Sequence, residues 1–150
     1  MSRIHRVAHA IAAIMLCSPR VSVAQAGEPR TLAGAEAAAR AWLLKPGNAM
    51  EHYRLITTDS VPKSELTCRS DRPTCWLTDG FPRVRIRAWR TAADSGAVTV
   101  DSVEVEIATY TNGRSVVDGG PFMDRGGYTY MYNYVGGKWV RGRLLSGWAS

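Results

Sequence analysis

The sequence predicts an α+β fold in which one or two N-terminal helices pack on a curved antiparallel sheet of about four to six strands, with one disulfide. Three observations support this fold class. Apolar residues recur at helical spacing early in the chain, alternating β-branched and aromatic segments fill its second half, and a pair of cysteines lies between these two regions.

The first residues have the pattern of a cleavable export signal. Arg3 and Arg6 precede the apolar run 7–17, and the small residues 24–26 form an Ala-Gln-Ala cleavage site. The run is shorter than the ~20 residues that cross a bilayer, so we expect no transmembrane anchor after processing. A buried N-terminal helix is the alternative, which the cleavage site disfavours. Residues 1–26 are therefore predicted to be a secretory signal peptide, with a periplasmic or secreted location for the mature protein.

The remaining segment, residues 27–150, is long enough for a single α+β domain with its own core and too short for two ordinary domains. The whole chain has 19 basic and 13 acidic residues, but three of the arginines and none of the acids lie in the predicted signal peptide, which lowers the net charge from +6 to +3. This modest charge argues against a nucleic-acid partner.

The two cysteines of the mature segment are predicted to form a disulfide. Cys17 leaves with the signal peptide, and Cys68 and Cys75 enclose a short loop that would close in an oxidising compartment. A structural zinc site is disfavoured, because there is no second cysteine pair and His52 is the only histidine after residue 26. The sequence therefore predicts no metal site and no cofactor.

Two helices are expected before the sheet. Thr31 is a suitable N-cap for a helix over 32–45, which the Pro-Gly pair at 46–47 would end. A shorter helix is expected over 49–56, and the segment 57–82 is expected to be irregular. The apolar stripe of the first helix consists of Leu32, Ala35, Ala39, Trp42 and Leu43, and the expected anchors of the irregular segment are Trp76 and Phe81.

The first predicted hairpin joins strands over 83–91 and 97–110. A four-residue loop would place Arg85 opposite Glu104, and the same register would set aliphatic side chains opposite one another. The alternating arginines of the first strand, which could suit a phosphate or a nucleic-acid backbone, are Arg83, Arg85 and Arg87. The register favours a different interpretation, a solvated sheet face with cross-strand ion pairs.

The second predicted hairpin gives the clearest fold signal. Strands over 127–135 and 138–145 flank Gly136-Gly137, a two-residue turn that requires positive φ. The face that carries aromatic and arginine residues consists of Tyr128, Tyr130, Tyr132, Tyr134, Trp139, Arg141 and Arg143. The other face, predicted to be core, carries Met131, Val135, Val140 and Leu144. Long ordered loops are often functional, but the glycine-rich segment 112–126 between the hairpins is expected to be a plain crossover or a short strand at 115–118.

The aromatic and arginine face is the candidate binding site, because tyrosine, tryptophan and arginine dominate binding hot spots. An envelope protein or a cell-wall glycan would suit such a face. The alternative is structural: the tyrosines would pack beneath a helix, while the arginine stems would cover apolar surface. The binding interpretation predicts a small non-catalytic protein, such as an envelope inhibitor or an immunity-type protein.

The order of elements resembles the nuclear-transport-factor-2-like fold, a cone-shaped α+β fold. The resemblance rests on the alanine-rich segment 37–42 leading into 49–56, and on the closing hairpin over 132–140. It departs from the family in the middle, where the disulfide loop and Pro82 occupy the place of the usual third helix. Members of this fold include enzymes, ligand pockets and protein-binding domains, so the resemblance leaves the function open.

Catalysis finds little support in the residue pattern. The mature segment has no free cysteine beyond the predicted disulfide, no serine nucleophile elbow and a single histidine. The alternative to the binding function is therefore a cone-shaped small-ligand pocket or enzyme of the resembled type. The polar groups of such a pocket would be His52, Tyr53, Asp59 and Asp101.

Overall fold

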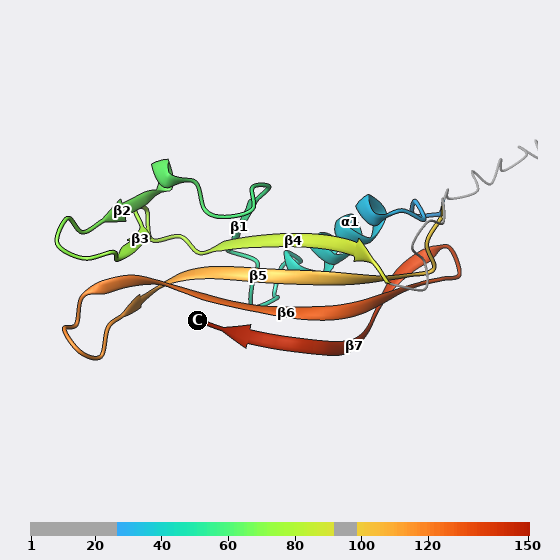
Figure 1. Ribbon diagram of the computed structural model, residues 1–150. Coiled ribbons are helices and arrows are strands. Elements are labelled where there is room, and N and C mark those ends of the chain that lie inside the picture. The colour runs from blue at the N-terminus through green and yellow to red at the C-terminus, as the bar shows by residue number, and fades with distance from the viewer. Residues whose placement is uncertain (1–26, 92–98) are drawn as a thin grey trace, which may run out of the picture.

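A five-stranded sheet forms the frame of the molecule. The computed structural model describes residues 27–91 and 99–150, and the predicted signal peptide lies outside them. In chain order the elements are α1 (Leu32–Leu43), β1 (Arg54–Ile56), the 3₁₀ turn η1 (Lys63–Glu65), β2 (Leu66–Cys68), β3 (Cys75–Leu77), β4 (Arg83–Arg90), β5 (Ser102–Arg114), β6 (Pro121–Val135) and β7 (Lys138–Ala149). The strand order of the large sheet is β1-β4-β5-β6-β7, and β2 pairs with β3 separately (Figure 1).

The first helix is confirmed with its cap. Thr31 is extended, and its Oγ1 accepts a hydrogen bond of 3.1 Å from the Gly34 N–H. Ala35, Ala39 and Leu43 of the predicted stripe are buried. The helix ends at Leu43, slightly before the predicted Pro-Gly stop, and the chain then turns away from the sheet.

The predicted second helix over 49–56 is wrong. Isolated turns occupy its first part, with the Tyr53 N–H bonded to the Met50 carbonyl at 3.0 Å, and β1 follows directly. β1 pairs in parallel with β4, with Arg54 opposite Arg83, so the sheet is mixed rather than purely antiparallel. A helix this short has little stability of its own, and strand pairing at the sheet edge satisfies the same backbone groups.

The first hairpin forms in a different register from the predicted one. Glu104 lies opposite Trp89 rather than Arg85, a displacement of four residues along the strand. Because side chains alternate with a period of two, an even displacement leaves each residue on its predicted face while changing its partner. The displacement arises because β4 ends at Arg90 and β5 begins only at Ser102, which makes the connection longer than the assumed four-residue loop.

The second hairpin is confirmed at its turn and differs further along. Gly136 and Gly137 have φ of 58° and 82°, and Tyr132 pairs with Arg141 as predicted. Beyond this point irregularities in the ladder shift the register, so Tyr128 lies opposite Gly147. The segment 112–126 is not a crossover loop, because β5 and β6 continue as one long hairpin that closes at residues 115–120.

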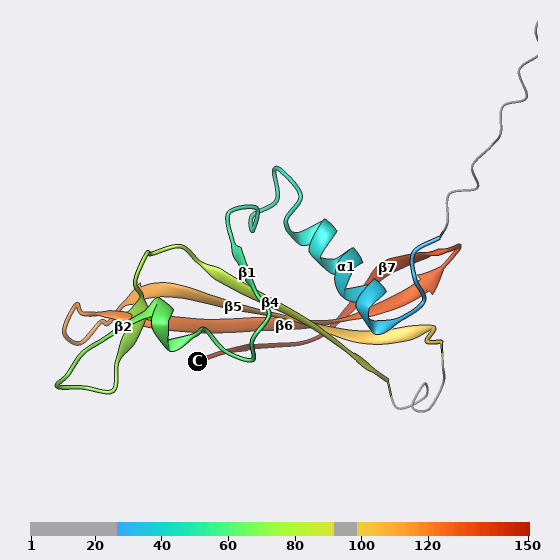
Figure 2. The same cartoon turned by 90° about the horizontal axis from the view of Figure 1, so that it is seen from above.

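Two cores lie on opposite faces of the sheet, toward opposite ends. Figure 2 shows α1 on one side of the sheet and β2 on the other. The core beneath α1 contains Ala35, Ala39, Ala88, Val100, Val103, Val105, Tyr132 and Trp139, and a smaller cluster beside it contains Leu43, Val84 and Ile107. The core beneath the two-stranded sheet contains Ile56, Val61, Leu77, Ala108 and Tyr110. The anchors of segment 57–82 are therefore Val61 and Leu77, whereas the predicted anchor Phe81 is exposed.

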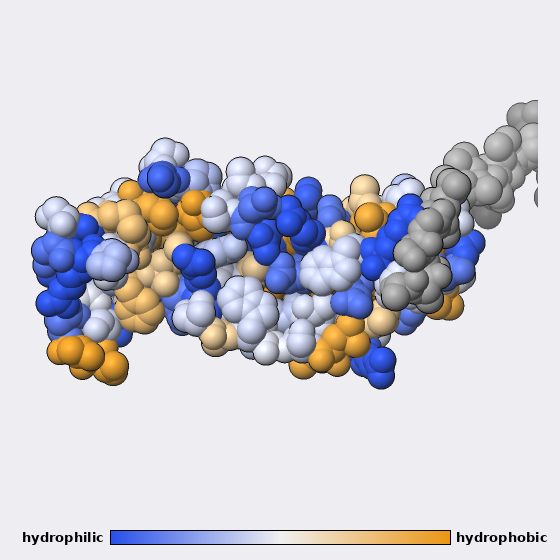
Figure 3. All heavy atoms as spheres, viewed as in Figure 1, coloured by the Kyte–Doolittle hydropathy of each residue, from blue (hydrophilic) through white to orange (hydrophobic). Residues whose placement is uncertain are grey.

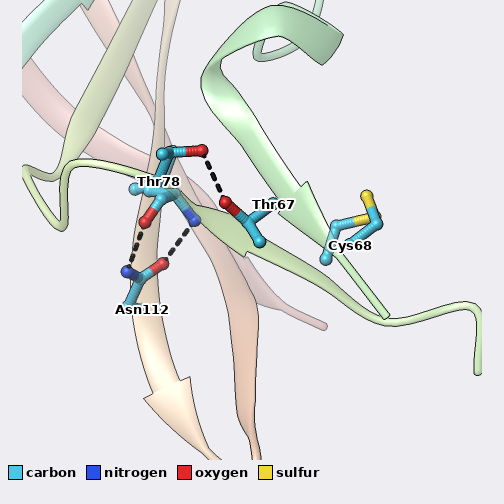
Figure 4. The surroundings of a disulfide bond; sticks show 6 residues. Thr67, Cys68, Thr78 and Asn112 are labelled. Atoms are coloured by element: carbon cyan, nitrogen blue, oxygen red, sulfur yellow. Dashed lines mark hydrogen bonds between the residues drawn. A yellow bond between two sulfur atoms is a disulfide. The ribbon is translucent and has the colours of Figure 1, made fainter. Parts of the chain in front are cut away.

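The two-stranded sheet is attached to the large sheet by side-chain hydrogen bonds near the disulfide. Cys68 and Cys75 are joined, as predicted. The Thr67 and Thr78 hydroxyls lie 2.9 Å apart across the two strands. The Asn112 side chain of β5 accepts from the Leu77 N–H at 2.7 Å and donates to the Leu77 carbonyl at 2.9 Å (Figure 4). The Asn112 bonds therefore join β3 to β5 at Leu77, which pairs with Leu66 at the end of the small sheet away from the disulfide.

Residues 27–31 form a strap between α1 and the β6–β7 turn. The Glu28 N–H donates to the Gly137 carbonyl at 2.9 Å, and the Glu28 carboxylate accepts from the Trp139 N–H at 2.6 Å. The Pro29 carbonyl accepts from the Trp139 indole at 2.9 Å. A Cβ on Gly34 would lie 1.9 Å from this same carbonyl oxygen, so the strap and the helix approach too closely for any side chain at that position.

Gly34→Ala tests this close approach. Helix propensity alone would make alanine about 1 kcal/mol more stable than glycine at a helical position. The overlap with Pro29 reverses that sign, and we expect the free energy of unfolding to fall by about 1–3 kcal/mol in urea denaturation. The control is Ala37→Gly on the exposed side of α1, which should lose about 1 kcal/mol by propensity alone. A Gly34→Ala variant more stable than the wild type would contradict the strap geometry.

Candidate functional site

The predicted aromatic face of the second hairpin lies beneath α1. Tyr132 is 1% exposed and Trp139 is 6% exposed, so neither presents a surface to a partner. The face predicted to be core is the open one, with Val135 and Val140 at least half exposed. The predicted orientation of the hairpin is therefore wrong, and the structural alternative, in which aromatic residues of this face pack under a helix, holds for Tyr132 and Trp139.

The composition of α1 explains this orientation. Its inward side presents Ala35 and Ala39, whose side chains are fully buried and very small. A helix with such a face approaches the sheet closely and leaves room for large side chains between its alanines, which the rings of Tyr132 and Trp139 occupy. Valine and leucine from the other face would not fill the same space as completely.

Tyr134, together with Trp139, holds the strap. The Tyr134 hydroxyl donates to the Glu28 carbonyl at 2.6 Å, and the Tyr134 and Trp139 rings meet edge to face at 5.3 Å. Their polar groups are therefore occupied by the chain itself. Arg143 is exposed on β7 and makes no ion pair within the described residues.

The remaining predicted residues gather in one concave site, which we call the aromatic cleft. Tyr128 and Tyr130 of β6 line a pocket of about 90 Å³ at the C-terminal end of α1. The Arg141 guanidinium of β7 lies 3.8 Å from the centre of the Trp42 ring and 5.1 Å from that of Tyr130. The full lining is Trp42, Leu43, Asn48, Ala49, Met50, Ile107, Tyr128 and Tyr130.

The wall of the aromatic cleft comes from the turns that replace the predicted second helix. The Asn48 side chain donates to the Trp42 carbonyl at 3.0 Å, and the Gly47 N–H donates to the Glu51 carboxylate at 2.5 Å. These bonds fix the segment that carries Met50 against the sheet. The site therefore depends on a region whose secondary structure the sequence analysis assigned incorrectly.

Trp42 is the cleft residue that the sequence analysis missed, because it falls on the apolar stripe of α1. It is 38% exposed, and Tyr128 is 45% exposed. The signal that could have found it is its place at the end of the stripe, one residue before the helix stops. Trp42 lies past the part of the sheet that α1 covers, so no strand within the described residues lies beneath it to bury the outer side of its ring.

The four polar residues of the alternative pocket each engage a different partner. His52 is exposed, with Nε2 3.4 Å from the Glu51 carboxylate. Tyr53 packs against the small cluster beside the main core. Asp59 pairs with Arg87, and Asp101 pairs with Arg30. Among the residues that the structure describes, no group of three or more His, Cys, Asp or Glu is arranged to hold a metal ion.

The arginine stripe of β4 is ion-paired, as predicted, but its partners differ from the predicted ones and Arg83 is buried rather than solvated. Arg83 is buried and contacts the carboxylates of Glu65 at 2.8 Å and Asp79 at 2.9 Å. The hydrogen bond from Arg83 holds the pKa of Asp79 below its usual range. Arg85 contacts Glu106 at 2.5 Å. These contacts join β4 to Glu65 and Asp79 in the preceding segment and to Glu106 of β5. With the pair of Arg87 and Asp59, each arginine of the stripe has a carboxylate partner.

Comparison with known proteins gives no family assignment for the chain. Searches of protein-family models, curated proteins and solved structures found no match. Within residues 27–91 and 99–150, no helix has the length and apolarity that crossing a bilayer would require.

Tyr132→Phe tests the burial of the aromatic face. The Tyr132 hydroxyl has no hydrogen-bond partner among the described residues, and burial raises the pKa of this tyrosine to about 12. Removing an unpartnered hydroxyl should leave the stability at neutral pH unchanged or raise it by up to about 2 kcal/mol. The wild type should lose stability as the pH rises from about 10 to about 12, because the unfolded chain ionises this group before the folded chain does.

Urea unfolding at pH 7 and at alkaline pH measures both effects. The phenylalanine variant should show a smaller alkaline loss than the wild type. Tyr128→Phe, which removes the hydroxyl from a half-exposed ring, is the control and should have the stability of the wild type at both pH values. A Tyr132→Phe variant less stable than the wild type by more than about 1 kcal/mol at pH 7 would mean that the hydroxyl makes a hydrogen bond.

Proposed function

We propose that the chain is an exported, non-catalytic binding domain whose aromatic cleft contacts a protein of the cell envelope, in the manner of a small inhibitor or immunity protein. The observation that carries the proposal is the stack of Arg141 on the half-exposed ring of Trp42, next to Tyr128. Tryptophan, tyrosine and arginine are the residue types that contribute most to protein–protein binding. Here Trp42 and Tyr128 line one concavity, and Arg141 stacks on Trp42 beside it.

The cleft is ordered before any partner arrives. Arg141 is held between two rings, so binding would cost it little additional side-chain entropy. Stacking uses the faces of the guanidinium and leaves its hydrogen-bond donors directed around its edge. Met50 adds a flexible apolar side chain to the wall, which can adapt to the shape of an inserted group.

The size of the cleft favours a protein over an enclosed small ligand. Its volume of about 90 Å³ is well below the ~300–1,000 Å³ of pockets that enclose drug-sized molecules. A protruding side chain of a partner fits that volume, with Asn48 available at the rim. The cone-shaped ligand pocket or enzyme, and a cell-wall glycan stacked on the aromatic rings, are the competing functions.

Export is supported by two independent features. The N-terminal segment has the pattern of a signal peptide, and the disulfide between Cys68 and Cys75 is of the kind that persists in oxidising compartments. The partner is therefore sought in the envelope rather than among cytoplasmic proteins.

The test compares capture of envelope proteins by the mature wild type and by a Trp42→Ala, Tyr128→Ala, Arg141→Ala variant. A hot-spot residue contributes about 2 kcal/mol or more to the free energy of binding, so loss of these residues should raise the dissociation constant at least 30-fold. The matched control is Val135→Ala, Val140→Ala, Arg143→Ala, which truncates three side chains outside the cleft. Both variants are first shown to unfold at the same temperature as the wild type.

Each outcome separates the competing functions. A partner that the wild type and the control retain and the cleft variant loses supports the proposal. Equal retention by all three proteins would reject the cleft as the binding site. Co-sedimentation with purified peptidoglycan that depends on the same three cleft residues, without a retained protein, would assign the site to a glycan instead.

A further inference from the structure

A second pocket lies at the end of the molecule away from the strap, between the disulfide loop and the β5–β6 turn. Both segments lie at the same end of the molecule in Figures 1 and 2. The pocket has a volume of about 390 Å³, within the ~300–1,000 Å³ range of ligand pockets. Its lining is Arg69, Arg72, Thr74, Arg114, Ser115, Val116, Asp118, Gly120, Pro121 and Phe122. We call it the tip pocket.

Ion pairs join the two loops that form the tip pocket. Asp118 of the turn pairs with Arg72 of the disulfide loop, and Arg69 Nη1 lies 3.5 Å from the same carboxylate oxygen. Arg69 also holds Asp71 with two hydrogen bonds, of 3.0 and 2.9 Å. The loop thus already binds planar carboxylates through paired guanidinium donors, which is the geometry that arginine offers best.

Two hydrogen bonds close the turn between β5 and β6. The Gly119 N–H donates to the Ser115 carbonyl at 2.8 Å, and the Gly120 N–H donates to the Asp118 carboxylate at 3.0 Å. Gly119 has φ of 66°, which glycine adopts without strain. The hydrogen bond from Gly120 is the largest of the interactions that keep the pKa of Asp118 below its usual range. Asp118 therefore stays ionised and paired with Arg72.

Two glycines allow the lining side chains to lie flat on the backbone. A Cβ on Gly120 would meet Arg69 Nη1 at 3.1 Å, and a Cβ on Gly113 would meet the Phe122 ring at 2.8 Å. The arginine and the aromatic ring therefore sit directly on the hairpin. One side of the pocket offers guanidinium donors, and the other offers the Phe122 ring and Pro121.

The charge of the tip pocket is not balanced from within. Three arginines and one aspartate line it, and the carboxylate of Asp71 engages Arg69 from the disulfide loop. Arg114 makes no ion pair within the described residues. Beside it, Val116 is fully exposed at the end of the hairpin. Figure 3 shows an apolar area at the lower left, at the end of the molecule where the β5–β6 turn lies. A ligand that combined a carboxylate with an apolar group would satisfy both features.

We infer that the tip pocket binds an acidic peptide segment of a partner protein. A carboxylate of the peptide would lie between Arg114 and Arg72, and a neighbouring apolar side chain would pack on Phe122. This site is independent of the aromatic cleft, which is built from other residues. Phosphate is the competing ligand, because arginine forks bind both anions, and the titration below distinguishes the two.

The test is an NMR titration of the isotope-labelled mature protein, read at the arginine Nε–H signals. The probes are a blocked tripeptide of leucine, glutamate and leucine, the same tripeptide with glutamine in the centre, and inorganic phosphate. Each is added to about 10 mM, above the ~1 mM dissociation constant of a weak specific complex. We expect saturable shifts at Arg72 and Arg114 with the glutamate peptide, and binding of the glutamine peptide at least tenfold weaker.

Arg114→Gln should weaken binding of the glutamate peptide at least fivefold without unfolding the protein, because Arg114 is exposed and unpaired within the described chain. Arg143→Gln, which removes an equally unpaired arginine on β7, is the control and should bind as the wild type does. Equal binding of the two peptides, no saturable shift at Arg72 or Arg114, or phosphate binding as tightly as the glutamate peptide would each overturn the inference.

Discussion

The structure depends on the contact between a helix with a small-residue face and a hairpin with large aromatic residues. Ala35 and Ala39 bring α1 close to the sheet, and Tyr132 and Trp139 supply the volume that the helix lacks. The strap adds a second constraint, because Gly34 lets the Pro29 carbonyl lie against the helix while it also binds the Trp139 indole. These contacts determine which face of the β6–β7 hairpin is buried.

The position of the aromatic cleft follows from where that contact ends. α1 stops at Leu43, so the last aromatic side chains of the stripe and of β6 remain partly uncovered, and the turns after the helix close around them. The other end of the sheet is covered from the opposite face by the disulfide-linked strands, and the loop between these strands forms the tip pocket together with the β5–β6 turn. One long sheet thus separates two candidate binding sites of different chemistry.

Features with strong local determinants were predictable from the sequence. The Thr31 cap, the Cys68–Cys75 pair and the Gly136-Gly137 turn each depend on a few adjacent residues. The orientation of the second hairpin was not predictable, because both of its faces carry enough apolar surface to be core. Only the alanine content of α1 decides between the two faces. The first hairpin was misregistered because alternation restricts a strand to even displacements without selecting one of them.

Site residues contributed by a single hairpin were found, and those that depend on tertiary placement were missed. Tyr128, Tyr130 and Arg141 were proposed from the hairpin pattern, whereas Trp42 and Met50 belong to segments whose packing the sequence does not specify. The tip pocket had no local signal, since its two loops are more than 40 residues apart in the chain, as the pair of Arg72 with Asp118 illustrates. A contact such as the one between Arg72 and Asp118 forms only when the folded sheet brings the two loops together.

The most direct test of this account compares the stabilities of Tyr132→Ala and Val140→Ala. Truncation of the buried Tyr132 ring should lower the free energy of unfolding by about 3–5 kcal/mol, because a large cavity would remain beneath α1. Val140 is half exposed, and its truncation should change the stability by no more than about 0.5 kcal/mol. The reverse order, with Val140→Ala the more damaging change, would mean that the other face of the hairpin is the core and would contradict the account.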